Sequence, residues 1–152
     1  MKHGDIAPNF ILKDETGKDF ELYKNLGKQI LLVFYPKDDT LVCSAQLAEY
    51  NDNLDEFIQN GIKVVGINAD SVQSHLDFCN KINIKFPLLA DENKKVSRQY
   101  EAINFLGMTK RLLMLIGTDR KVLWNVSALP VTFIKTKEIV EKVKLLNSKE
   151  MT

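Results

Sequence analysis

The chain has 152 residues, the size of one ordinary domain, and 45% of them are hydrophobic. Its 21 basic and 20 acidic side chains leave a net charge of +1, which gives no footprint for nucleic acid or an anionic membrane. No apolar run approaches the roughly 20 residues of a transmembrane helix, and the first residues lack the apolar part of a secretory signal. We therefore expect one domain, residues 1–152, of a soluble cytoplasmic protein.

Two cysteines and two histidines limit the chemistry available. Cys43 and Cys79 do not form a CxxC pair, and His3 and His75 do not join them at metal-ligand spacing. We therefore expect no metal site and no cofactor. In a reducing compartment cysteines are usually thiols, and a disulfide there tends to be transient and functional.

Short apolar segments alternate with segments of helical period along the chain. The residues 29–35 form an apolar run typical of a buried strand, whereas 42–60 repeat their apolar positions on one helical face. In chain order we predict a hairpin of strands 10–13 and 20–22, a strand 29–35, a helix 42–60 ending at Gly61, a strand 62–67, a helix capped by Asp70 or Ser71 and running to about 82, a strand or turn 86–89, a helix 93–100, strands 111–116 and 122–126, and a helix 136–146.

This alternation favours an α/β fold. The first large units read strand–helix–strand, which gives two parallel strands with a right-handed crossover. The strands 111–116 and 122–126 are close in sequence, so we expect them to be antiparallel. The prediction is a mixed central β-sheet flanked by helices, with a hairpin at the N-terminus.

The segment around Cys43 carries the chemical information. Pro36 ends a buried strand, a short polar loop follows, and the next helix begins near Cys43. Unsatisfied N–H groups and the macrodipole at a helix start favour a thiolate, the reactive form of cysteine. Thr40 is placed to cap this helix and to turn its hydroxyl toward the sulfur or an incoming ligand. The position alone also fits a buried core cysteine, so both interpretations stay open here.

Thiolate formation by itself explains little catalysis. A free thiol is about 3% ionised at neutral pH, so complete ionisation gains at most about 30-fold. Enzymes typically reach roughly a millionfold or more. A catalytic Cys43 therefore needs groups that position a substrate and stabilise developing charge, such as backbone N–H groups, Thr40 and a cation.

The pattern Pro36-x-x-x-Thr40-x-x-Cys43 after an apolar strand resembles the signature of peroxiredoxins. Residues 4–10 resemble the N-terminal stretch of that family. Residues 34–38 and 86–91 resemble its branch named after the bacterioferritin comigratory protein, and 111–124 resembles its arginine-plus-hairpin region. The resemblance implies a thioredoxin-like fold and a thioredoxin-dependent peroxidase that reduces hydrogen peroxide and organic hydroperoxides through a cysteine sulfenic acid.

The same resemblance implies a role for each matching residue. Cys43 attacks the peroxide, and Thr40 hydrogen-bonds both the sulfur and the peroxide. Arg111 stabilises the thiolate and the charge that develops, and Pro36 closes the pocket against water.

The assignment of Arg111 leaves alternatives. Arg111 can be a solvated residue at a strand edge, in which case Lys110 or Arg120 is the cation in register. Gln46 occupies a position where the family often has a glutamate that orients the arginine. Gln46 can hydrogen-bond Arg111 but adds no charge.

Cys79 is implied as the resolving cysteine. Many members of the branch place that cysteine five positions after the attacking one, where this chain has Ala48. Some place it in the next helix, where Cys79 lies, and it then forms an intramolecular disulfide with Cys43 that a reductant opens. Because a disulfide needs Cα atoms within about 7 Å, we expect local unwinding during turnover. The alternative is a core residue in the apolar stripe of Val72, Leu76, Cys79 and Ile82.

The implied partners are a peroxide and thioredoxin or a similar dithiol reductant, with the protein as a monomer or weak dimer. A thiol–disulfide oxidoreductase on the same fold would normally carry CxxC, which the chain lacks. Two other functions stay open: a non-enzymatic redox sensor or binding module, and a peroxidase whose Cys43 is resolved by an external thiol.

Overall fold

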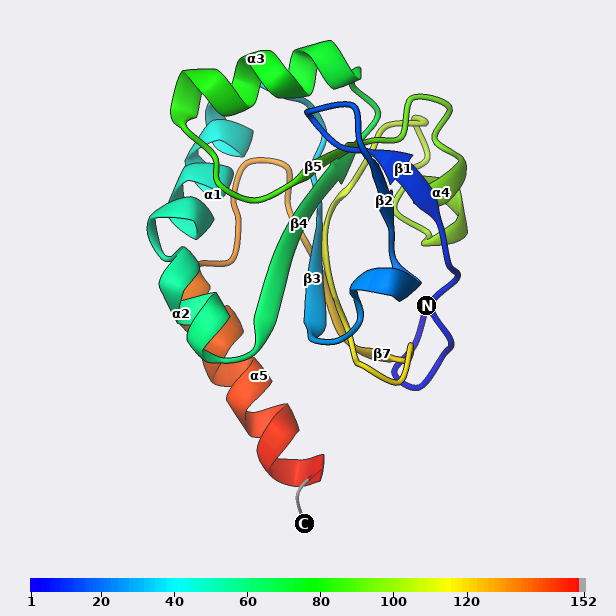
Figure 1. Cartoon of the computed structure of the whole chain (residues 1–152), viewed down its shortest axis with the longest axis vertical. Coiled ribbons are helices and arrows are strands. Elements are labelled where there is room, and N and C mark those ends of the chain that lie inside the picture. The colour runs from blue at the N-terminus through cyan, green and yellow to red at the C-terminus, as the bar shows by residue number, and fades with distance from the viewer. Residues whose placement is uncertain (151–152) are drawn as a thin grey trace.

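The computed structural model describes residues 1–150 as a central sheet with helices on both faces (Figure 1). In chain order the elements are β1 (Ile11–Lys13), β2 (Asp19–Glu21), the 3-10 turn η1 (Tyr23–Asn25), β3 (Gln29–Phe34), α1 (Leu41–Asp52), α2 (Leu54–Gln59), β4 (Ile62–Asn68), α3 (Val72–Ile82), β5 (Leu88–Ala90), α4 (Lys95–Gln99), β6 (Arg111–Ile116), β7 (Val122–Ala128) and α5 (Thr136–Glu150).

The sheet has seven strands in the order β2-β1-β5-β4-β3-β6-β7. The central strands β3, β4 and β5 are parallel, whereas β6 and β7 extend the sheet as antiparallel neighbours. The β1–β2 hairpin pairs Leu12 with Phe20 and completes the other edge. The predicted mixed sheet, the parallel strand–helix–strand unit and the N-terminal hairpin are all confirmed.

The sheet separates two apolar cores, which explains the unbroken apolar run of β3. Leu31 and Val33 belong to the core under α1, α2, α3 and α5. Ile30 and Leu32 alternate with them and belong to the core on the opposite face, which α4 helps to cover. Because β3 is buried on both sides, its carboxyl end is a rigid base for the loop that follows.

The prediction of one helix over 42–60 is wrong in one respect, since α1 and α2 are separated at Asn53. The Asn53 amide donates to the Glu49 carbonyl at 2.8 Å and to the Glu49 carboxylate at 2.7 Å. Such a local side-chain bond competes with the regular helical ladder, and Asn53 leaves helical geometry at φ −112° and ψ 21°. Glu49 in turn accepts two hydrogen bonds from Thr136, which ties the break to the start of α5.

The structure confirms two predicted helix boundaries in this region, the glycine after α2 and the cap before α3. Gly61 has a φ of +72°, a left-handed conformation that favours glycine just after a helix. Ser71, rather than Asp70, is the residue that caps α3, because its hydroxyl accepts from the Ser74 N–H at 3.1 Å. In residues 1–150 we find no helix with both the length and the apolar character needed to cross a bilayer.

Gly66 in β4 faces two buried side chains with no room for a Cβ, and we expect an alanine there to destabilise the protein. An added Cβ would lie 2.6 Å from the Leu88 Cδ2 and 3.3 Å from the Tyr35 Cε1. Both side chains are fully buried, so relief requires repacking, which costs about 1–3 kcal/mol. Urea unfolding of Gly66→Ala measures the change in the free energy of unfolding. Gly27→Ala is the matched control, because open space surrounds Gly27.

Candidate active site

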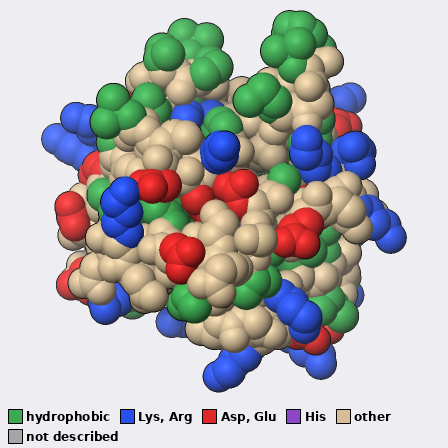
Figure 2. Space-filling view, turned by 90° about the horizontal axis from the view of Figure 1, so that it is seen from above, with side chains coloured by type: hydrophobic (Ala, Val, Ile, Leu, Met, Phe, Trp, Pro, Cys, Tyr) green, Lys and Arg blue, Asp and Glu red, His purple; other side chains and the backbone are tan. Residues whose placement is uncertain are grey.

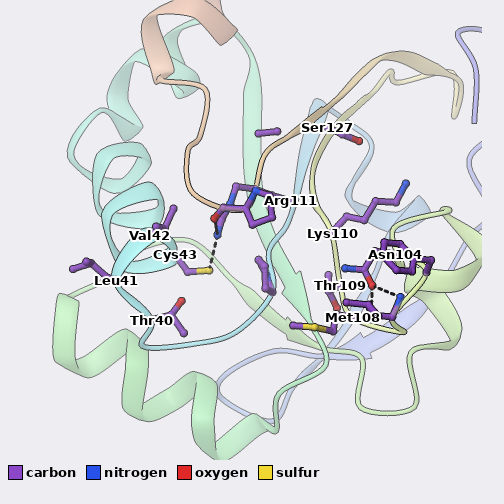
Figure 3. A pocket seen from close by; sticks show the side chains of 15 residues that line it. Thr40, Leu41, Val42, Cys43, Asn104, Met108, Thr109, Lys110, Arg111 and Ser127 are labelled. Carbon is purple, nitrogen blue, oxygen red and sulfur yellow. Dashed lines mark hydrogen bonds between the residues drawn. The ribbon is translucent and has the colours of Figure 1, made fainter.

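Cys43 lies in the first turn of α1, directly beyond the carboxyl end of β3. Its side chain is buried, and it opens onto a cavity of about 630 Å³. Figure 3 shows Thr40 and Cys43 on one side of this cavity and Met108 and Asn104 on the other. The cavity is lined from three segments: the start of α1, the loop before β6, and the end of β7 with Pro130.

Arg111 is the cation that reaches the sulfur. It is the first residue of β6 and only 5% exposed, which excludes the alternative of a solvated strand edge. Its Nη2 donates to the Cys43 Sγ at 3.3 Å and to the Pro130 carbonyl at 3.2 Å (Figure 3). The other two register candidates do not make this contact: Lys110 lines the cavity, and Arg120 stacks on the Tyr23 ring elsewhere.

Gln46 holds Arg111 in place, as expected. The Gln46 Oε1 accepts from the Arg111 Nη1 at 2.5 Å, and the Gln46 Nε2 donates to the Tyr50 hydroxyl at 3.2 Å. That hydroxyl donates to the Ile134 carbonyl at 2.6 Å. Burial raises the pKa of Tyr50, so it stays a neutral donor. The fixed chain of bonds runs from Arg111 through Gln46 and Tyr50 to the segment before α5.

The positive charge of the Arg111 guanidinium lies beside the Cys43 sulfur without an acidic partner in the described part of the chain. Within residues 1–150, no carboxylate lies within ion-pair distance of Arg111. Its partners are an amide oxygen, a carbonyl oxygen and the Cys43 sulfur, so its positive charge is not neutralised by an acid. A buried cation acts strongly on a neighbouring sulfur, because few water molecules screen it. This arrangement stabilises negative charge that develops at or beside the sulfur.

Thr40 occupies the expected place, but its hydroxyl points elsewhere. Thr40 has the extended geometry of a helix cap at φ −95° and ψ 158°, yet its side chain makes no capping bond. The Oγ1 instead donates to the Lys37 carbonyl at 3.2 Å, not to the Cys43 sulfur. Thr40 and Pro36 both line the cavity that Cys43 faces, so a rotation of the Thr40 side chain changes what its hydroxyl reaches.

Cys79 lies apart from this cavity. It is on α3, 8% exposed, and belongs to the same apolar core as Cys43, and both cysteines are free thiols. Burial raises the pKa of Cys79 to about 12, with further contributions from the negative charges of Glu15, Asp38 and Asp14. Cys79 is therefore unreactive in this conformation.

The buried face of α3 differs from the stripe predicted for it. The structure buries His75, Phe78 and Cys79, whereas Val72 and Leu76 are only partly buried. Sequence reasoning missed His75 because a lone histidine on a helix has no pattern of its own. The signal that could have found it is its spacing of four residues before Cys79, which places both on one helical face.

Sequence reasoning also missed an apolar rim around the cavity. Phe105 is 96% exposed and Leu106 is 68% exposed, and Met108 and Leu41 are exposed beside them. The run 105–108 was visible as apolar residues around a glycine, but without a period that gives a strand or helix. Figure 2 shows hydrophobic side chains gathered in two projecting groups at one side of the molecule. Among residues 1–150, no cluster of three or more metal-ligating side chains is present.

Comparison with known proteins agrees with this geometry. Residues 3–125 match the AhpC/TSA family. The chain belongs to the AhpC/TSA family. It is 36% identical to Peroxiredoxin Bcp of Escherichia coli (strain K12) over 129 residues, which cover 80% of this chain and 83% of that protein. This relationship confirms the resemblance to the peroxiredoxins and to the branch named after the bacterioferritin comigratory protein.

Two further similarities concern other AhpC/TSA relatives. Chloroplastic peroxiredoxin Q of Triticum aestivum is 39% identical over 100 residues, 66% of this chain, and the chain spans about half of its length, 46%. The crystal structure of peroxidoxin BcpB from Mycobacterium tuberculosis superposes with a TM-score of 0.84 at 30% identity, covering 97% of each chain. The thioredoxin-like fold expected for this AhpC/TSA protein is thereby confirmed.

We expect alkylating agents to distinguish the two thiols of this AhpC/TSA protein. At pH 8, far below a pKa of about 12, the Cys79 thiol is almost entirely protonated, and the thiolate is the form that reacts. Iodoacetamide should therefore modify Cys43 in the folded protein and leave Cys79 intact, as followed by mass spectrometry of peptides. In urea both residues should react at similar rates. Equal rates in the folded protein would contradict the environment described for Cys79.

Proposed function

We propose that this protein is a thiol peroxidase that reduces hydrogen peroxide and organic hydroperoxides through Cys43. The observation that carries the proposal is the contact of 3.3 Å between the Arg111 guanidinium and the Cys43 sulfur, at the wall of an open cavity. The relationship to a protein named Peroxiredoxin Bcp supports it. A buried structural cysteine would need neither an unneutralised cation nor an access route.

In the first step, the Cys43 thiolate attacks one oxygen of the peroxide. A sulfur–oxygen bond forms as the O–O bond breaks, so the sulfur is oxidised to a sulfenic acid and the peroxide is reduced. The leaving oxygen takes up a proton, which balances the proton that the thiol lost, and departs as water or an alcohol. Arg111 stabilises the thiolate before attack and the charge on the leaving oxygen during it.

Thr40 and Pro36 complete the proposed site. Thr40 lines the cavity close to Cys43 in the chain, and its hydroxyl can exchange the Lys37 carbonyl for a peroxide oxygen by side-chain rotation. A bound peroxide would thus accept a hydrogen bond from the Thr40 hydroxyl, which donates to the Lys37 carbonyl in this structure. Pro36 forms part of the cavity wall and limits the access of water to the sulfur.

The cavity supports organic hydroperoxides as substrates in addition to hydrogen peroxide. A volume of about 630 Å³ is far larger than one peroxide molecule needs. Its rim carries Phe105, Leu106 and Met108, which give an alkyl group apolar surface to contact. Hydrogen peroxide needs only the donors at Cys43.

In the second step, we propose that the Cys79 thiol condenses with the sulfenic acid of Cys43, which forms a disulfide and releases water. A dithiol then reduces the disulfide by exchange and becomes oxidised itself. Because Cys79 is buried with a raised pKa, α3 must unwind near Cys79 first. Unwinding also exposes the sulfur to water and removes the main cause of the raised pKa.

The partner that fits this cycle is thioredoxin or a similar dithiol reductant, acting in the cytoplasm on a monomer or weak dimer. A reducing compartment suits two cysteines that are both free thiols. The net charge of +1 supports neither a nucleic acid nor a membrane surface as partner.

One equivalent of hydrogen peroxide added to the reduced protein tests the proposal. Stopped-flow fluorescence of Trp124 should report fast oxidation that is lost in Cys43→Ser. Intact mass should then show a product two mass units lighter in the wild type, but a sulfenic or over-oxidised Cys43 in Cys79→Ser. Fast oxidation without the lighter product would leave Cys43 resolved by an external thiol. Oxidation no faster than that of a free thiol would contradict a peroxidase and favour a redox sensor.

Thr40→Val tests the proposed donor while keeping the shape of the side chain. Loss of one hydrogen bond to a developing charge lowers rates by about 10²-fold, and we expect a loss of this order in Cys43 oxidation. Thr40→Ser keeps the hydroxyl and should keep most of the rate, as measured by the same fluorescence trace. A fully active Thr40→Val would remove Thr40 from the mechanism.

A further inference from the structure

A buried carboxylate lies in the loop between β3 and α1, and the mechanism above does not use it. Asp38 is only 6% exposed, and its Oδ1 accepts from the Tyr35 hydroxyl at 2.5 Å and from the Asn68 amide at 3.3 Å. Its Oδ2 accepts from the Ser74 hydroxyl at 2.8 Å and lies 2.6 Å from the His75 Nδ1. One side chain therefore joins the ends of β3 and β4 to α3.

The partner of this carboxylate is a histidine with no exposed surface. The His75 Nε2 lies 2.9 Å from the Leu89 carbonyl, which can only accept, so this nitrogen carries a proton. Burial alone would raise the pKa of Asp38, but the hydrogen bond and charge of His75, with the Tyr35 and Ser74 hydroxyls, lower it below its usual range. Asp38 is thus a buried carboxylate whose Oδ2 is bonded to the His75 Nδ1, while the other ring nitrogen of His75 is bonded to the Leu89 carbonyl.

The two residues of this pair belong to the two segments that the proposed cycle has to rearrange. Asp38 lies between Pro36 and Thr40, in the loop that lines the peroxide cavity. His75 precedes Cys79 by one helical turn on the buried face of α3. The Asp38 N–H also donates to the Asp70 carboxylate at 2.7 Å, which fixes the loop to the segment before α3.

We propose that the buried Asp38–His75 pair is a latch that joins the peroxide-site loop to α3 and sets the rate at which Cys79 is released toward oxidised Cys43. Both are positioning residues, because they act through the segments that they hold. The inference rests on the proposed function, since it concerns the step in which Cys79 resolves Cys43.

The physical basis is the cost of parting two buried, hydrogen-bonded groups. Unwinding α3 at Cys79 loosens the turn that carries His75, and it draws the ring away from Asp38 and from the Leu89 carbonyl. Each group would then be left without its partner in a poorly solvated place, which is unfavourable. The latch therefore keeps the peroxide site assembled and Cys79 covered until Cys43 has been oxidised. Weakening it should favour unwinding and speed the disulfide step.

The chain offers a matched control for this pair. Lys81 on α3 forms an ion pair at 2.8 Å with Asp39, the residue after Asp38, so it bridges the same two segments. Both side chains of that pair are more than half exposed, and exposed pairs contribute little. A difference in effect between the two pairs thus separates the contribution of burial from the mere presence of a link between the loop and α3.

The test separates the two chemical steps. Trp124 fluorescence gives the rate of Cys43 oxidation by hydrogen peroxide, and acid quenching followed by intact mass gives the rate of disulfide formation. We expect Asp38→Asn and His75→Gln each to speed disulfide formation about tenfold, a typical coupling for residues of one network, and the double variant to add little more. The oxidation rate should not rise, and Lys81→Ala should match the wild type in both steps.

A milder variant and a second measurement cover the case in which the pair is also needed for folding. Ser74→Ala removes one hydrogen bond from Asp38 and keeps the contact between Asp38 and His75, so it should change the disulfide rate in the same direction by less. In a Cys43→Ser background, His75→Gln should also raise the rate at which iodoacetamide modifies Cys79. This readout needs no peroxide chemistry.

The outcomes separate the latch from the peroxidase. An unchanged disulfide rate, equal changes in both steps, or an effect of Lys81→Ala as large as that of His75→Gln would overturn the latch and leave the peroxidase standing. A wild type that oxidises Cys43 but never forms the disulfide would overturn the resolving role of Cys79 and, with it, this function of the latch. Faster disulfide formation and faster Cys79 alkylation in His75→Gln together support it.

Discussion

The contact between the Arg111 guanidinium and the Cys43 sulfur is the constraint on which the rest of the site depends. It requires an arginine at the start of β6 and a cysteine in the first turn of α1, two segments that meet only because β6 pairs with β3. The guanidinium has to be held without an acid that would neutralise it, and Gln46 meets that need with an amide oxygen. A cation left free to act on sulfur is worth more in a buried site than in water.

Much of the fold could be predicted from the sequence because its determinants are local. A strand buried on both faces, such as β3, has to be apolar throughout. The strands β6 and β7 are separated by only a short turn in the sequence, which predicts that they pair as antiparallel neighbours. The break at Asn53 could not be predicted, because the Asn53 amide and a Glu49 carboxylate anchored on Thr136 decide it together. Local propensity does not reveal a contact made by residues far apart in the chain.

The site could be predicted only where a residue's position implies its surroundings. Cys43 at a helix start and Arg111 at a strand start were identifiable, the latter through a family resemblance. The Thr40 hydroxyl donates to the Lys37 carbonyl rather than to the sulfur in this structure, an orientation that the position of Thr40 in the sequence does not reveal. The spacing of His75 from Cys79 places both on one helical face, but the partners of His75 come from β5 and from the loop after β3, which α3 alone does not reveal.

The segment between β7 and α5 contacts the site through main-chain carbonyl groups. The Pro130 carbonyl accepts from Arg111 and the Ile134 carbonyl accepts from Tyr50, so main-chain atoms beyond residue 125, where the family match ends, shape the surroundings of Arg111. Carbonyl groups are supplied by any amino acid, which leaves the side chains here free to vary. Substitutions and length changes in this connector are therefore a route by which the surroundings of Arg111 can drift during evolution, or be engineered, while Cys43 and Arg111 themselves stay unchanged.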